Sequence, residues 1–268
     1  MIKTNFHTHT IYCDGKDTPE ELITAAIDKG FTSLGFSGHS FFKKDDDYCM
    51  SLENEKKYFS EISKLKEKYK EKINIFCGIE QESFSDTPKY DYDFVIGSVH
   101  NVYKNGQYLV VDGSLAELKD ILATFYNNDF DEFAKDYFET VSNIITKTNA
   151  DIIGHFDLIL KNMERLPYTP TQQFFDYARN AVLNLVKYNK PFEINTGAMA
   201  RGYRTAPYPH ETILKMIFDN GGSIIFSSDC HNKEYLDYGY SIAEEIALKV
   251  GFKNQAIITD QGIKYTSI

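Results

Sequence analysis

The sequence predicts an α/β fold in which helices cover a parallel β-sheet. Two observations carry this prediction: short apolar segments alternate with amphipathic helical segments, and the apolar segments are continuous rather than alternating. Continuous apolar runs are typical of strands that are buried on both faces. Repeated βα units form either a closed barrel or a doubly wound open sheet. The length of 268 residues suits one domain spanning residues 1–268, and we find no linker or internal repeat that would divide it.

The helical segments show their boundaries in the sequence. In the first, Thr18 can cap the helix, Pro19 suits the first helical position, Glu21 can complete a capping box and Gly30 can end the helix. The second, residues 51–70, places apolar residues at helical spacing with charged residues opposite. Further helical segments are expected at residues 114–125, 130–148, 171–188, 210–220 and 234–250.

Seven apolar segments are expected to form the strands, and most of them end on a residue that can bind a metal ion. They span residues 2–7, 32–39, 73–80, 93–100, 150–156, 191–197 and 222–229, and only the sixth ends differently, at Asn195. The carboxyl ends of the strands in a βα barrel meet at one mouth, where active sites are built. We therefore expect one cluster of His7, His9, His39, Glu80, His100, His155, Asp229 and His231, with Asp14 joining from the loop after the first strand.

This set of imidazoles and carboxylates predicts a metal site. His7 and His9 are two positions apart in an extended segment, so their side chains point to the same face. Nitrogen and oxygen ligands of this kind suit Zn, Mn or Fe better than Ca or Mg. Because the set is too large for one ion, two or three divalent transition-metal ions are expected. Such ions can lower the pKa of a bound water and hold a phosphoryl oxygen.

Composition narrows the range of partners. The chain has 29 basic and 39 acidic residues, a net charge of −10, whereas a nucleic-acid-binding protein needs a basic face. No apolar run approaches the ~20 residues of a membrane span, and the first residues lack the apolar core of a signal peptide. Four scattered cysteines without a C-x-x-C pair are expected to be reduced thiols. We expect a cytoplasmic protein that binds a small metabolite and neither nucleic acid nor membrane; the sequence predicts no particular oligomeric state.

Six motifs, in their order along the chain, resemble those of the polymerase and histidinol phosphatase (PHP) family. They are FHTHT at 6–10, SGHS at 37–40, GIE at 78–80, GSVH at 97–100, GHFD at 154–157 and SSDCH at 227–231. Within the family, the length and the segment EINTGAMARGYRTAPYP, residues 193–209, resemble the stand-alone histidinol-phosphate phosphatases. The resemblance implies a distorted seven-stranded (β/α)7 TIM-like barrel with a trinuclear metal site.

The same resemblance implies three metal positions, with Glu80 bridging the first two. Many relatives have a histidine where this chain has Asp14, and here a carboxylate takes its place. The first ion would be held by His7, His9, Glu80 and Asp229, the second by Glu80, His100 and His155, and the third by Asp14, His39 and His231.

Basic residues near the expected mouth are candidates for binding phosphate. Arg201 and Arg204 lie in the loop after the sixth strand, and guanidinium groups match phosphate in a bidentate manner. We expect both to bind the substrate and to polarise its phosphoryl oxygens, with Lys161 as a further candidate. Asp229 or His231 is expected to pass a proton to the leaving oxygen.

Three other residues near these motifs have simpler explanations. Strand alternation is expected to turn Cys230 away from the ligands and into packing. His210 precedes a helix, and either helix entry or substrate contact explains it. Asp157 could orient a metal ligand or cap a helix.

The expected function is hydrolysis of a phosphate monoester by attack of a metal-bridging hydroxide. The resemblance names the substrate: L-histidinol phosphate would yield L-histidinol and phosphate in histidine biosynthesis. One alternative is a related phosphoesterase that acts on nucleotides or nucleic-acid ends. The other is a non-catalytic binding module that metal ions brace.

Overall fold

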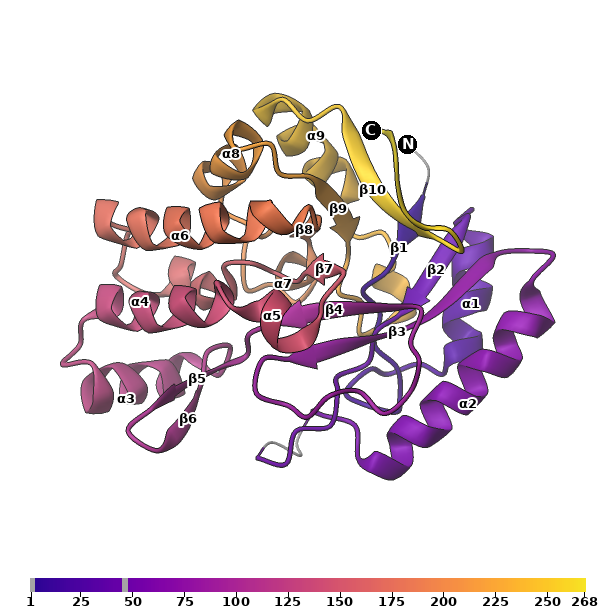
Figure 1. Ribbon diagram of the computed structural model, residues 1–268, viewed down its shortest axis with the longest axis horizontal. Helices are drawn as coiled ribbons and strands as arrows, with labels where there is room; N and C mark the ends of the chain where they lie inside the picture. Colours follow the sequence, from indigo (N-terminus) through magenta and orange to yellow (C-terminus); the bar gives the residue numbers. More distant parts are fainter. Residues whose placement is uncertain (1–2, 45–47) are drawn as a thin grey trace.

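The computed structural model describes residues 3–44 and 48–268 and contains a central sheet of seven parallel strands (Figure 1). All seven predicted strands are confirmed. Their order in the sheet is β1 (Thr4–Asn5), β2 (Ser33–Phe36), β3 (Asn74–Glu82), β4 (Phe94–Ser98), β7 (Ile152–Ile153), β8 (Phe192–Asn195) and β9 (Ile224–Ser227).

The first and last strands approach each other, so the sheet is a nearly closed barrel. Beyond the ends of β1 and β9, a parallel bridge pairs Thr8 with Cys230. Two backbone hydrogen bonds form there: His9 N donates to Cys230 O at 2.8 Å, and Cys230 N donates to His7 O at 3.1 Å. The fold is a distorted TIM-like (β/α)7 barrel, as the family resemblance implied, and the open-sheet alternative is excluded.

Helices surround this barrel, and the capping box predicted at Thr18 and Glu21 is present. The predicted helix at 130–148 is in fact two, because the chain turns at Ser142 and Asn143. The last helix begins later than predicted, because Gly239 takes a left-handed conformation just before it (φ 73°). The helices are α1 (Pro19–Asp28), α2 (Leu52–Tyr69), α3 (Leu115–Phe125), α4 (Phe130–Val141), α5 (Ile144–Thr148), α6 (Gln172–Leu185), α7 (Gly197–Ala200), α8 (Glu211–Asp219) and α9 (Tyr240–Val250), with short 3-10 turns at Leu158–Leu160, Met163–Arg165, Val186–Tyr188 and Lys233–Tyr235. Within the described residues, none of the helices combines the length and apolar character needed to cross a bilayer.

Two antiparallel hairpins were not predicted. β5 (Asn101–Lys104) and β6 (Gln107–Val110) directly follow β4, on the carboxyl-terminal side of the barrel. β10 (Asn254–Thr259) and β11 (Gly262–Ser267) form the second hairpin, and β10 lies beside β9 (Figure 1). The second hairpin packs apolar residues of β10 against those inside the barrel.

Aromatic rings fill the amino-terminal half of the barrel interior. Phe6 makes edge contacts with Phe76 and Phe94, both with ring centres 5.8 Å apart. The rings fit because glycines face them: a Cβ atom at Gly78 would lie 2.4 Å from the Phe94 ring, and one at Gly35 would lie 2.8 Å from Phe6. This half is therefore a packed apolar layer, and the polar interior is confined to the carboxyl-terminal mouth.

Candidate metal centre

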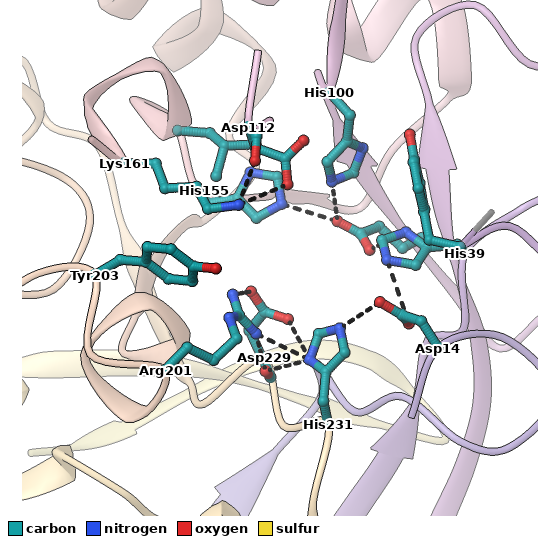
Figure 2. Close-up of a pocket in the computed structure, with 13 residues that line it drawn as sticks. Asp14, His39, His100, Asp112, His155, Lys161, Arg201, Tyr203, Asp229 and His231 are labelled. Carbon is teal, nitrogen blue, oxygen red and sulfur yellow. Dashed lines mark hydrogen bonds and ion pairs between the residues drawn. The ribbon is translucent and has the colours of Figure 1, made fainter. Parts of the chain in front are cut away.

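The predicted ligands converge at the mouth of the barrel, around one cavity. His7 and His9 are buried at its base, with exposed fractions of 0% and 1%. The cavity is lined by Glu80 and by the ligands that Figure 2 labels: Asp14, His39, His100, His155, Asp229 and His231.

The carboxylate of Glu80 occupies the centre of this cluster. It is 1% exposed, and both of its oxygens face imidazole nitrogens. Such a position suits a carboxylate that bridges two ions. Its Oε2 lies 2.9 Å from His39 Nδ1, 3.2 Å from His7 Nε2 and 3.6 Å from His9 Nε2, and its Oε1 lies 2.9 Å from His155 Nε2 and 3.4 Å from His100 Nε2.

The ligand atoms form four overlapping groups in which all atoms lie within 4.8 Å of one another. The set expected for the third ion is brought together, and His9 joins it. The other three groups mix the expected sets: two combine members of the first two sets or fall within the first, and the last places His39 of the third set beside Glu80 and His100. The groups are His9, Asp14, His39 and His231; His7, His155 and Asp229; His7, His9 and Glu80; and His39, Glu80 and His100.

Unpaired atoms at the base of the cavity fit a metal ion. His7 Nε2, His9 Nε2 and Glu80 Oε2 are buried and lie close to one another, but within the described part of the chain these contacts lack the geometry of a hydrogen bond. Buried polar atoms in proteins nearly always have a partner. Burial, with the nearby His231 and His39, lowers the pKa of His9 to about 3, so this imidazole is neutral, as ligation requires. The residues present therefore fit transition-metal ions.

The buried carboxylates of the cluster remain ionised. Burial would raise the pKa of Glu80, but His7 and His39 outweigh it and lower that pKa well below its ordinary value. Burial would likewise raise the pKa of Asp229, but Arg201 and His7 lower it well below the ordinary value. Both side chains are thus available as anionic ligands at neutral pH.

Two further buried carboxylates, which the sequence analysis missed, orient the ligand imidazoles. Glu193 Oε1 lies 2.6 Å from His7 Nδ1, and its Oε2 accepts a 2.7 Å hydrogen bond from the backbone N–H of His155. Glu82 Oε2 lies 3.0 Å from His100 Nδ1. A metal-binding histidine usually donates its second ring N–H to such a group. The signal was available, because a glutamate inside an apolar strand is costly unless it is paired.

The backbone at Asp229 is held in a strained conformation. Its φ of 47° lies in the left-handed region, which few residues other than glycine adopt, although asparagine and aspartate enter it more readily than most. Asn195 Nδ2, at the end of β8, donates to Asp229 Oδ2 at 3.3 Å. Gly197 lies so close that a Cβ atom there would be 2.8 Å from Asp229 Oδ2. The loop after β8 therefore fixes the direction of this carboxylate.

Arg201 lies on the cavity wall, as expected for a phosphate-binding residue. Its Nη2 lies 3.1 Å from Asp229 Oδ2, and its Nη1 lies 2.9 Å from His231 Nδ1. Lys161 also lines the cavity and packs over the ring of Tyr203, 4.6 Å from its centre. Figure 2 shows the aromatic ring of Tyr203 beside the cavity, between Lys161 and Arg201.

The structure corrects the expectation that Arg204 also faces the substrate. Arg204 is 5% exposed and is not among the residues that line the cavity. Its guanidinium lies 4.6 Å from the ring centre of Tyr208, and its charge acts on the buried Asp157. The turn that follows α7 separates the two arginines, so Arg204 packs inside the protein behind the mouth.

The structure also shows where Cys230, His210 and Asp157 lie. Cys230 is buried in an apolar cluster, and its thiol donates to Asn232 O, which confirms packing. His210 is the N-cap of α8, where Nδ1 accepts from Thr212 N at 3.2 Å, which confirms helix entry. Asp157 precedes the 3-10 turn Leu158–Leu160 without a side-chain cap hydrogen bond there, and its Oδ2 accepts instead from His210 N at 2.8 Å.

This barrel and the cluster at its mouth define a class: α/β-barrel proteins whose strand ends form a metal-binding mouth. The family model of the PHP domain matches residues 5–197, and the chain belongs to this family.

Individual relatives match this chain over nearly its whole length. A Schizosaccharomyces pombe protein named "Probable histidinol-phosphatase" is 27% identical over 96% of this chain and 89% of its own length. A solved Listeria monocytogenes structure superposes with a TM-score of 0.79 at 20% identity, covering 90% of this chain and 99% of that one. The Lactococcus lactis histidinol phosphate phosphatase, solved with Zn, L-histidinol and phosphate, gives a TM-score of 0.74 at 23% identity, covering 98% of this chain and 99% of that one.

Proposed function

We propose that the protein is a metal-dependent phosphomonoesterase that hydrolyses L-histidinol phosphate to L-histidinol and phosphate. One observation carries the proposal: the buried cluster of imidazoles and carboxylates shares a cavity of about 200 Å³ with Arg201. A metal-binding cluster beside a fixed guanidinium suits a phosphate ester. The substrate is supported by the names of the full-length relatives and by the ligands of the L. lactis protein.

We propose that the cluster holds two or three divalent transition-metal ions. Zinc is supported by the L. lactis complex, and manganese and iron suit the same donors. When bound, such ions lower the pKa of a water molecule and neutralise charge on the phosphoryl oxygens. The proposed ligands are His7, His9, Asp14, His39, Glu80, His100, His155, Asp229 and His231, with Glu193 and Glu82 orienting the imidazoles that they contact.

The chain's own side chains would then bind and orient the phosphate. Arg201, held by Asp229, would donate hydrogen bonds to the phosphoryl oxygens and stabilise the charge that develops on them. Lys161 also lines the wall, but its ammonium is engaged by the backbone carbonyl of Asp112 and the ring of Tyr203, so Arg201 would be the main phosphate-binding group. Asp229 stays ionised and pairs with Arg201, so it has no proton to donate. His231 would donate a proton to the leaving oxygen only through the ring nitrogen that does not bind metal.

We further propose that water attacks phosphorus directly, without a phosphorylated enzyme. Among the described residues that line the cavity there is no serine, threonine or cysteine to act as a nucleophile, and its histidines and all of its carboxylates except Asp112 belong to the proposed metal cluster. A single in-line displacement inverts the configuration at phosphorus. Hydrolysis of a chirally labelled phosphate ester is expected to show this inversion, whereas net retention would require a protein nucleophile.

The test of the proposed function is a panel of phosphomonoesters assayed with protein reconstituted with Zn, Mn or Fe. We expect the highest kcat/KM for L-histidinol phosphate and no turnover after chelation. Faster hydrolysis of mononucleotides would favour the nucleotide phosphoesterase. A metal-loaded protein that hydrolyses none of the esters would favour the non-catalytic binding module.

A further inference from the structure

One carboxylate on the cavity wall lies outside the proposed metal cluster. Asp112 follows β6 and precedes α3, so the unpredicted β5–β6 hairpin delivers it to the mouth. The loop after β7 fixes its position: Lys161 Nζ donates to the backbone carbonyl of Asp112, and Asn162 Nδ2 donates to Gly113 O at 3.1 Å. On the other side, Val111 N donates to His100 O at 2.8 Å.

The charge of Asp112 is only partly compensated within the protein. Lys161 Nζ lies 3.5 Å from Asp112 Oδ2, which is longer than the ~2.7–2.9 Å of a strong charged hydrogen bond. The ammonium of Lys161 is instead engaged by a backbone carbonyl and by the ring of Tyr203. The Asp112 side chain remains 30% exposed beside the cavity.

The carboxylate is nevertheless ionised. Burial would raise the pKa of Asp112, but Lys161 and His100 outweigh burial and lower it below the ordinary value. The other carboxylates that line the cavity, Asp14, Glu80 and Asp229, belong to the cluster assigned to metal ions. Asp112 is thus the wall carboxylate available to an organic cation.

The cavity therefore has two chemically different ends. Figure 2 shows Asp112 on the side of the cavity opposite Arg201 and Asp229. Arg201 suits the phosphate of a ligand, and a carboxylate suits an ammonium group. L-histidinol phosphate carries both, on neighbouring carbon atoms.

We propose that Asp112 binds the primary ammonium group of the substrate and thereby selects amino-alcohol phosphates over uncharged phosphate esters. This proposal rests on the proposed function, because it assigns the substrate's amine to the same cavity. Removing the charge should weaken binding of the amine and leave the phosphate end unaffected.

The test compares Asp112→Asn with the wild type and with Asp120→Asn, an exposed acid on α3 that serves as the control. All proteins are loaded with zinc, and binding is measured by calorimetry. For Asp112→Asn we expect the Kd of L-histidinol to rise about 10- to 100-fold, the range for loss of a hydrogen bond to a charged group. The Kd of inorganic phosphate and that of 3-(imidazol-4-yl)propanol, which lacks the amine, should stay within twofold of wild type.

Kinetics provide a second readout. The kcat/KM for L-histidinol phosphate should fall by a similar factor, whereas that for p-nitrophenyl phosphate, which lacks the amine, should fall by a clearly smaller factor. Asp112→Glu, which keeps the charge, should recover part of the affinity for L-histidinol. An unchanged Kd for L-histidinol, or equal weakening of L-histidinol and phosphate, would overturn the role of Asp112. A wild-type protein that hydrolyses nucleotides instead and does not bind L-histidinol would overturn the proposed function itself.

Discussion

Glu80 contacts five imidazoles, so its side chain is the residue on which the site most depends. In Glu80→Ala the histidines lose their shared anion, and their repulsion is no longer compensated. We expect loss of bound metal and a fall in kcat of several orders of magnitude, because metal and nucleophile depend on each other. Metal analysis and steady-state kinetics measure both, with the surface change Glu245→Ala as the control. Full metal content with near-normal turnover would refute the proposed site.

Substitutions of Arg201 and Arg204 should have different effects: the first should lower activity, and the second should lower stability. Arg201→Ala removes a donor from the cavity wall, so we expect kcat/KM to fall about 10²- to 10³-fold with little change in Tm. Arg204→Ala removes a buried side chain that packs over the ring of Tyr208, which should cost about 1–3 kcal/mol of stability. Thermal unfolding and kinetics of both variants give the comparison. The opposite pattern, with Arg204 controlling KM and Arg201 controlling Tm, would contradict this assignment.

At the scale of secondary structure, the strands were predictable because each is a continuous apolar run that ends on a polar residue. The clustering of the metal ligands was also predictable, because the carboxyl ends of parallel strands lie at the same edge of the sheet. The two hairpins were not predictable in the same way: β6 and β11 have exposed faces, and no helical segment separates the two strands of either hairpin. As a result Asp112, which the β5–β6 hairpin delivers to the cavity, went unnoticed. The burial of Arg204 depends on the turn after α7, which local sequence does not specify.

The interior of the barrel gives a prediction about β3. In Gly78→Ala the new methyl group would lie 2.4 Å from the buried Phe94 ring, which cannot move aside without displacing Phe6. Overpacking of this kind costs about 1–3 kcal/mol. Gly113→Ala is the matched control, because its nearest contact is the flexible end of the Glu117 side chain at 3.0 Å. Denaturant unfolding should show the difference; equal stability of the two variants would mean that the aromatic layer is not tightly packed.

Across the whole molecule, the ligand cluster ties together strands that are distant in sequence. Its members follow β1, β2, β4, β7 and β9 or lie on β3, so they span the seam where Thr8 meets Cys230. That seam has only a few backbone hydrogen bonds. The site exists only in the folded barrel, so a metal ion would bind the folded state alone. A ligand of this kind stabilises the folded state by about 2.7 kcal/mol when its free concentration is 100 times its Kd. Zinc is therefore expected to raise the Tm of the entire chain in one transition.

The size of this increase should depend on pH. Burial would lower the pKa values of His7, His39 and His100, but the carboxylates around them outweigh burial and raise all three above the ordinary value. In the metal-free protein the stability from their protonated forms is present below pH ~6.5 and is lost as pH rises through the raised values. Metal ligation requires neutral imidazoles and releases these protons, so zinc affinity rises with pH.

The Tm difference between zinc-loaded and chelator-treated protein should therefore be larger at pH 8 than at pH 6. Scanning calorimetry at both values, with calorimetric titration to count the protons released by zinc, measures the effect. The control for the pH dependence of the metal-free protein is chelator-treated Glu80→Ala. Its imidazoles lack the central carboxylate that raises their pKa values. Its stability should change less between the two pH values than that of the chelator-treated wild type. A zinc-induced increase that is equal at both values, or larger at pH 6, would show that these histidines do not lose protons when the metal binds.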